Sequence, residues 1–187
     1  MKYVVATVLF TAPLFTATGA QADSLCQVWN VDVVQNAIAG QWSTRGATSI
    51  ESVIFSTTEN TVGQVVISSA GQFASASVVE GAAIPDVTLE SDSAFMFDIC
   101  PVYDVDGVDD ILDTVEADWI ADAVSGTPCG PRDLLQLTAT VDMGEQGGGA
   151  VTFIPYFDDQ IVMISEVEIV GDWGIAFVTE VALLTPQ

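Results

Sequence analysis

The chain of 187 residues is half hydrophobic, and it carries 26 acidic side chains against three basic ones. It has no histidine, which excludes Ser-His-Asp and Cys-His catalysis, and its three cysteines alone cannot form a four-ligand Cys/His zinc site. The net charge of −23 argues against a nucleic-acid role, because phosphate contacts depend on Lys and Arg.

The first 22 residues have the three parts of a secretory signal peptide. Met1-Lys2 is the positive start, an apolar stretch follows up to Phe15, and Ala20-Gln21-Ala22 has the small-residue pattern of a cleavage site. The apolar stretch is shorter than the about 20 residues that a membrane span needs. We therefore expect cleavage after Ala22 and export to the periplasm or the cell exterior, with residues 23–187 as a single acidic domain.

Cleavage would remove Lys2 and leave Arg45 and Arg132 as the only basic side chains. Without lysine, Schiff-base chemistry is excluded, and the catalysis that remains is a pair of carboxylates, as in glycoside hydrolysis. Spacing selects no pair among the carboxylates in or beside apolar segments, which are Asp98, Asp158, Asp159, Glu166 and Glu168. The acidic excess is typical of solubility in salt, and alternatively of cation binding or of a basic partner.

The predicted elements follow the periodicity of the apolar residues. Residues 25–38 have roughly helical spacing and predict a short or broken helix that ends at Gly40. Residues 108–124 carry one apolar stripe and predict an amphipathic helix packed on a sheet. Glycines at 147–149 and at Gly171-Asp172 predict hairpin loops. Alternation predicts strands at 52–57, 63–69, 73–79, 87–91, 94–99, 134–141, 150–155, 161–170 and 175–184.

Short strands with close turns predict a mainly β fold, bordering on α+β. We expect an antiparallel β barrel or sandwich of about 8–9 strands, with a short N-terminal helix and one amphipathic helix inserted between strands. Gly40-Gln41-Trp42, after a short helix and before many strands, resembles the start of lipocalin-like barrels, although the inserted helix departs from that pattern. An outer-membrane barrel is a further alternative, which the short strands and the ending Thr185-Pro186-Gln187 disfavour.

Export places the cysteines in an oxidising compartment, where two of the three are expected to pair. We expect a disulfide between Cys100 and Cys129, because both lie in loop contexts on either side of the predicted amphipathic helix. Its role would be stability, and Cys26 would remain a buried thiol.

The segment from Asp104 to Asp110 is the part of the sequence most similar to a Ca²⁺ loop. Asp104, Asp106 and Asp110 fall at ligand positions when Gly107 is set at the sixth position of an EF-hand loop, but the first and last positions do not match. The alternative is an acidic helix start. No other cofactor is expected.

Trp42 and Trp173 lie beside glycines in expected loops and are the candidate ligand-binding residues, with an apolar ligand or a sugar as the partner. Because most catalytic side-chain sets are missing while a sizeable core is present, we expect an exported, non-catalytic binding or interaction protein for a small molecule, a glycan or a basic protein. The alternatives are a carboxylate-dependent hydrolase acting on polysaccharide and a structural component of an extracellular layer.

Overall fold

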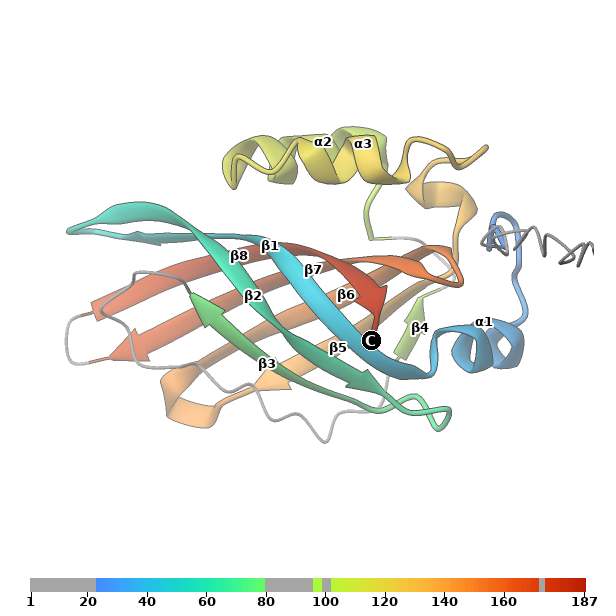
Figure 1. Cartoon of the computed structure of the whole chain (residues 1–187). Coiled ribbons are helices and arrows are strands. Elements are labelled where there is room, and N and C mark those ends of the chain that lie inside the picture. Colours follow the sequence, from blue (N-terminus) through green and yellow to red (C-terminus); the bar gives the residue numbers. More distant parts are fainter. Residues whose placement is uncertain (1–22, 80–95, 99–101, 172–173) are drawn as a thin grey trace, which may run out of the picture.

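A computed structural model describes residues 23–79, 96–98, 102–171 and 174–187 of the chain (Figure 1). Within these ranges the strands form one antiparallel sheet in the order β3-β2-β1-β8-β7-β6-β5-β4. The strands are β1 (Gly40–Ser52), β2 (Ser56–Ile67), β3 (Phe73–Val79), β4 (Met96–Asp98), β5 (Gln136–Asp142), β6 (Gly147–Phe157), β7 (Gln160–Gly171) and β8 (Gly174–Pro186). The helices are α1 (Val31–Ile38), α2 (Val105–Thr114) and α3 (Trp119–Val124), with 3-10 turns η1 (Pro131–Asp133) and η2 (Gly144–Gln146). None of the described helices has the length and apolar character needed to cross a bilayer.

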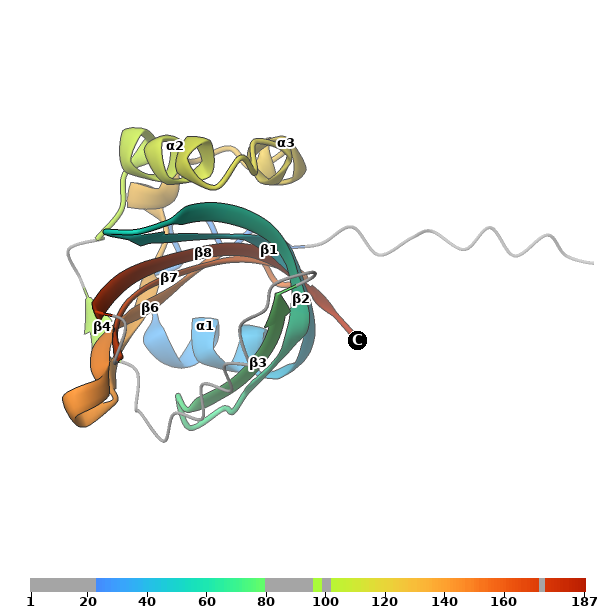
Figure 2. The same ribbon diagram turned by 90° about the vertical axis from the view of Figure 1, so that its left-hand side faces the viewer.

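The sheet is strongly curled and has a concave and a convex face (Figure 2). Helix α1 lies against the concave face, whereas α2 and α3 lie over the convex face (Figures 1 and 2). The prediction of a mainly β protein with an N-terminal helix and a helical segment between strands is therefore confirmed. The described strands belong to a single curled sheet with the shape of half a barrel.

Each face of the sheet buries its own apolar cluster, because successive side chains of a strand point to opposite faces. A buried aliphatic or aromatic side chain contributes about 1.5–3 kcal/mol, so these clusters hold the helices on the sheet. The concave cluster includes Val34, Ile38, Trp42, Val65, Phe73, Leu137, Phe153, Ile161 and Leu184. The convex cluster includes Ala47, Leu112, Val115, Ile120, Ile154, Tyr156, Val162, Ile164 and Val181.

Helix α1 is shorter than the predicted helix over residues 25–38. It begins after Asn30, whose side-chain oxygen accepts a hydrogen bond from the Val33 amide at 3.2 Å. The preceding residues bind the sheet instead, since the Leu25 amide donates to the Tyr156 carbonyl at 3.2 Å. A left-handed backbone at Gln27, with φ of 56°, separates this segment from the helix.

The predicted single helix over residues 108–124 is wrong, because the chain turns between α2 and α3. Glu116 adopts φ of 56°, and the Ala117 amide donates to the Leu112 carbonyl at 2.9 Å, which is the Schellman arrangement of a helix end. Val115 and Ala117 are fully buried around this turn. The apolar stripe therefore continues through the break, and periodicity alone did not reveal it.

Strand β1 was not predicted, and the strand predicted over residues 52–57 is wrong. Residues 53–55 form the turn between β1 and β2, where the Ser52 hydroxyl oxygen accepts from the amides of Ile54 and Phe55. Val53 at this turn is 98% exposed, although it is apolar. The apolar run that indicated a strand is thus the tip of a hairpin.

The glycines at residues 147–149 were predicted to form a hairpin loop, but they lie in β6, and η2 precedes them. A Cβ atom on Gly149 would lie 2.0 Å from the Glu166 carbonyl oxygen of β7. Glycine is therefore required because the two strands approach closely. The hairpin expected at Gly171 is present, since Gly171 pairs with Gly174. The predicted strand 87–91 lies outside the described residues.

Candidate functional sites

Trp42, one of the two tryptophans predicted to bind a ligand, is part of the concave core cluster. Its side chain is 3% exposed in the concave cluster, and its Nε1 donates to the Ile38 carbonyl at 2.9 Å. The indole therefore fixes the end of α1 to the start of β1. Trp173, the other tryptophan predicted to bind a ligand, lies outside the described residues.

The three aspartates predicted to bind calcium lie along the start of α2. Asp104 is the N-cap, since one carboxylate oxygen accepts from the Gly107 amide at 2.9 Å and the other pairs with Arg132. These contacts, with the hydrogen bond from Gly107 as the largest cause, lower the pKa of the Asp104 carboxyl. Asp106 and Asp110 lie on the helix itself. In the described part of the chain, no three acidic or cysteine side chains lie close enough together to hold a metal ion.

The disulfide joins Cys26 to Cys129, with Cα atoms 6.0 Å apart. The predicted pairing of Cys129 with Cys100 is corrected accordingly, and the expectation that Cys26 is a free thiol is wrong. Cys100 itself lies outside the described residues. The segment before α1 reaches Cys129 because the Gln27 amide donates to the Asp133 carbonyl at 2.8 Å. This contact links residues more than a hundred positions apart, which local spacing does not reveal.

Glu166, one of the carboxylates considered for catalysis, is held in a structural network. The Tyr103 hydroxyl donates to the Glu166 carboxylate at 2.5 Å. Burial, and then the contact with Glu166, raises the pKa of Tyr103 well above its usual value. Gln136 is fully buried beside it and exchanges hydrogen bonds with the Tyr103 backbone, while its amide also donates to the Pro131 carbonyl. This network fastens the start of α2 to β5 and β7.

The concave face has a second, polar part beyond the apolar cluster. We define the polar concave region as Thr44 and Thr48 of β1, Thr61 of β2, Ser165 of β7 and Glu180 of β8. Side chains an even number of residues apart on a strand point to the same face, and so do residues directly opposite each other on paired strands. By this rule, all five residues point to the same concave face as Trp42. All five are buried.

The three threonine hydroxyls of this region are buried, and no described residue forms a hydrogen bond with them. The side chains of Thr44, Thr48 and Thr61 are 2–5% exposed, and none of their Oγ1 atoms makes a hydrogen bond in the described part of the chain. A buried hydroxyl left unpaired costs about 1–3 kcal/mol. Native proteins pair most such groups, so three on one face require an explanation.

Gly46 lies at the centre of these hydroxyls. It separates Thr44 from Thr48 along β1, and it is directly opposite Thr61 of β2. A Cβ atom on Gly46 would lie 1.9 Å from the Val181 carbonyl oxygen, so the curl of the sheet requires glycine here. The three threonines are therefore neighbours of a position that carries no side chain.

Two carboxylates lie on either side of Thr48. The register places Glu59 of β2 and Glu180 of β8 directly opposite Thr48, one on each neighbouring strand. Glu59 is half-buried and accepts a hydrogen bond from the Thr57 hydroxyl at 3.0 Å, whereas Glu180 is buried. Ser165 lies opposite Glu180 on the far side. One row across the sheet thus presents two carboxylates and two hydroxyls.

No family model matches the chain, and no curated protein is significantly similar to it in sequence. The site therefore has to be interpreted from its own chemistry.

Sequence reasoning missed the polar concave region because it missed β1. Thr44 and Thr48 are both an even number of residues from Trp42, which places them on the same face as a large buried side chain. Recognising residues 40–52 as a strand would have indicated a polar patch on that face. Glu180 lies within a predicted strand. That it faces the same side of the sheet as Thr48 follows only from the pairing of β1 with β8, which the sequence does not reveal.

Proposed function

We propose that the protein is an exported, non-catalytic binding protein that holds a small hydroxyl-rich ligand, such as a mono- or disaccharide, in the polar concave region. The observation that carries this proposal is the group of three buried threonine hydroxyls that have no hydrogen-bond partner among the described residues. A ligand that pairs with these hydroxyls would recover the free energy that their burial costs.

The chemistry of the region favours a ligand rich in hydroxyl groups. Threonine hydroxyls both donate and accept, whereas ionised carboxylates only accept. A ligand that contacts Thr48 together with Glu59 or Glu180 must therefore offer several donors as well as acceptors. Sugar hydroxyls offer both. A phosphate or carboxylate ligand is disfavoured, because it would approach a protein with a net charge of −23.

Threonine-to-valine substitutions test the proposal, because valine keeps the shape and removes the hydroxyl. We expect Thr48→Val and Thr61→Val to raise the free energy of unfolding by about 1 kcal/mol each in the absence of ligand. The same variants are expected to weaken sugar binding at least tenfold. Binding is measured by titration calorimetry and by the shift in melting temperature across a panel of mono- and disaccharides.

Thr152→Val is the matched control. Thr152 is equally buried, but its hydroxyl bonds to that of Thr138 at 3.0 Å, and it lies on the convex face. We expect this variant to lose about 1 kcal/mol of stability and to keep its sugar affinity. The proposal is wrong if no sugar binds the wild type, or if Thr48→Val binds as tightly as Thr152→Val does.

A polysaccharide hydrolase is the second candidate, and the positions of Glu59 and Glu180 favour it. Their Cα atoms are two strand spacings apart, about 10 Å, with Thr48 between them. Carboxylates on two sides of a bound sugar are the arrangement that glycoside hydrolysis requires. Turnover of a glycan that both Glu59→Gln and Glu180→Gln abolish would replace the non-catalytic proposal with this one.

A further inference from the structure

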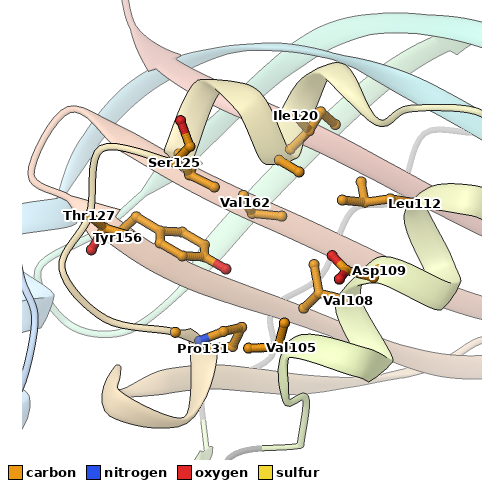
Figure 3. Close-up of a pocket in the computed structure, with 13 residues that line it drawn as sticks. Val105, Val108, Asp109, Leu112, Ile120, Ser125, Thr127, Pro131, Tyr156 and Val162 are labelled. Atoms are coloured by element: carbon orange, nitrogen blue, oxygen red, sulfur yellow. The ribbon is translucent and has the colours of Figure 1, made fainter.

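A cavity of about 190 Å³ lies on the other side of the sheet, between the α2–α3 layer and the convex face (Figure 3). Its floor is formed by Tyr156 of β6 and Val162 of β7. Its walls are formed by apolar side chains of the two helices, which include Val108, Leu112 and Ile120. The cavity is somewhat larger than an apolar cavity of about 150 Å³ that accepts benzene. It has room for one small ring or short alkyl group.

The polar groups of this cavity are few. The Asp109 carboxylate of α2 and the Tyr156 hydroxyl point toward one another across it (Figure 3). Tyr156 is buried and Asp109 is exposed, so the carboxylate marks the side that is open to solvent. Burial, and to a smaller extent the nearby Asp109 carboxylate, raises the pKa of Tyr156 to about 12. The carboxylate at the open side favours a cationic group on a ligand in this cavity.

No basic side chain in the described part of the chain pairs with Asp109. Arg132 binds the Asp104 carboxylate, and Arg45 lies over the Trp119 ring with its guanidinium carbon 5.0 Å from the ring centre. Both arginines thus contact residues at the start of α2 or α3. The Asp109 side chain therefore lies at the mouth of an apolar cavity without a basic partner among the described residues.

We propose that this cavity is a binding site for a small apolar amine. The apolar body lies between the helices and the sheet, against Leu112 and Val162, and the ammonium group lies at the mouth beside Asp109. Cavity size limits the body to about one ring, and the acidic surface of the whole protein attracts cations toward the mouth. The polar concave region is on the opposite face of the sheet, so this site does not rest on the function proposed above.

Three probes of similar shape and different charge test the proposal on the full-length protein. We expect benzylamine to bind with one-to-one stoichiometry in titration calorimetry at low salt. Benzyl alcohol is expected to bind at least tenfold more weakly, and benzoate is expected to show no binding. Equal binding of all three, or no binding of benzylamine, would overturn the proposal.

Two variants of α2 separate the site from the general charge of the protein. Asp109→Asn is expected to weaken benzylamine binding about tenfold, since one charge near contact distance has an effect of that order. Asp110→Asn removes the same charge from the next residue, which does not line the cavity, and should change the affinity less than twofold. Equal effects of the two variants would show that only the overall charge attracts the amine.

A third variant fills the cavity. Ala121 of α3 lines it and is half-buried, so Ala121→Leu adds volume inside without removing a core side chain. We expect this variant to lose benzylamine binding while its circular dichroism spectrum stays unchanged. Retained binding in a folded Ala121→Leu protein would place the amine elsewhere and contradict the proposal.

Discussion

At the scale of single residues, the two tyrosines of the described part of the chain are both buried in the convex cluster. Burial and Glu166 raise the pKa of Tyr103, and burial and Asp109 raise that of Tyr156 to about 12. The folded state therefore keeps phenol protons that the unfolded chain releases near pH 10. This contribution to stability is complete below pH 10, and it is lost as the pH rises through the pKa values of the folded state.

An alkaline titration checks these tyrosines. In a Tyr3→Phe variant, which leaves Tyr103 and Tyr156 as the only tyrosines, we expect almost no tyrosinate absorbance at pH 10.5 while the protein is folded. The absorbance should appear together with unfolding as the pH rises further. Asp109→Asn should move the onset to lower pH, because it removes the charge that opposes ionisation of Tyr156. A reversible transition near pH 10 in the folded protein would contradict this assignment.

At the scale of elements, Glu116 is the residue where the helical segment turns. A residue other than glycine in the left-handed region costs about 1–2 kcal/mol, and glycine avoids that cost while losing more entropy on folding. We expect Glu116→Gly to raise the free energy of unfolding by about 0.5–1 kcal/mol in urea denaturation. Glu116→Ala, which removes the same charge but keeps a Cβ, serves as the control and should give little of this gain. Equal stabilisation by both variants would assign the effect to charge.

The disulfide ties the segment before α1 to the loop after α3, and its stabilising effect is also testable. Its cysteines are 103 residues apart, so the bond closes a long loop of the unfolded chain. In a Cys100→Ser background, we expect Cys26→Ser and Cys129→Ser each to lose about 2–4 kcal/mol of unfolding free energy. Cys100→Ser alone should lose little. Peptide mapping without reduction should yield the Cys26–Cys129 pair, and a Cys100–Cys129 peptide would contradict the structure.

The elements that the sequence predicted well are those whose signal is local. Strands β5 to β8 overlap the predicted strands, because residues 135–141 alternate and the later segments are rich in apolar and β-branched residues, and β3 spans the predicted residues 73–79. The errors occur where contacts between residues distant in sequence determine the secondary structure. Residues 40–52 are a strand because β2 and β8 pair with both edges, although Ser43, Thr44 and Arg45 interrupt the apolar pattern.

The candidate sites were less predictable than the fold for the same reason. The polar concave region combines residues from β1, β2, β7 and β8, and the amine cavity combines two helices with two strands. Neither set is close in sequence. The predicted aspartate cluster was local, and its first member, Asp104, proved to be a helix cap paired with Arg132. The spacing of the aspartates therefore marked the N-terminal cap of α2, where we had expected a metal site.

At the scale of the whole molecule, the dominant property is unbalanced negative charge. The chain carries 26 acidic side chains and three basic ones, and the two arginines of the described residues both contact the helical layer. Self-repulsion therefore acts on the folded state across its surface, with few ion pairs to offset it. Added salt shortens the range of this repulsion from about 10 Å at 0.1 M to about 3 Å at 1 M.

We therefore expect sodium chloride to stabilise the protein. Raising the concentration from 0.05 M to 1 M at pH 7 should raise the melting temperature by about 5 °C, which corresponds to roughly 2 kcal/mol for a domain of this size. A neutral osmolyte at the same osmolality is the control, since it is excluded from the protein surface but does not screen charge. A rise in melting temperature with salt alone would assign the effect to screening. Lowering the pH toward 4 protonates carboxylates and reduces the net negative charge, so the same salt step should have a much smaller effect there. A melting temperature that is unchanged or falls with salt at pH 7 would mean that the acidic groups are spaced too widely to repel one another.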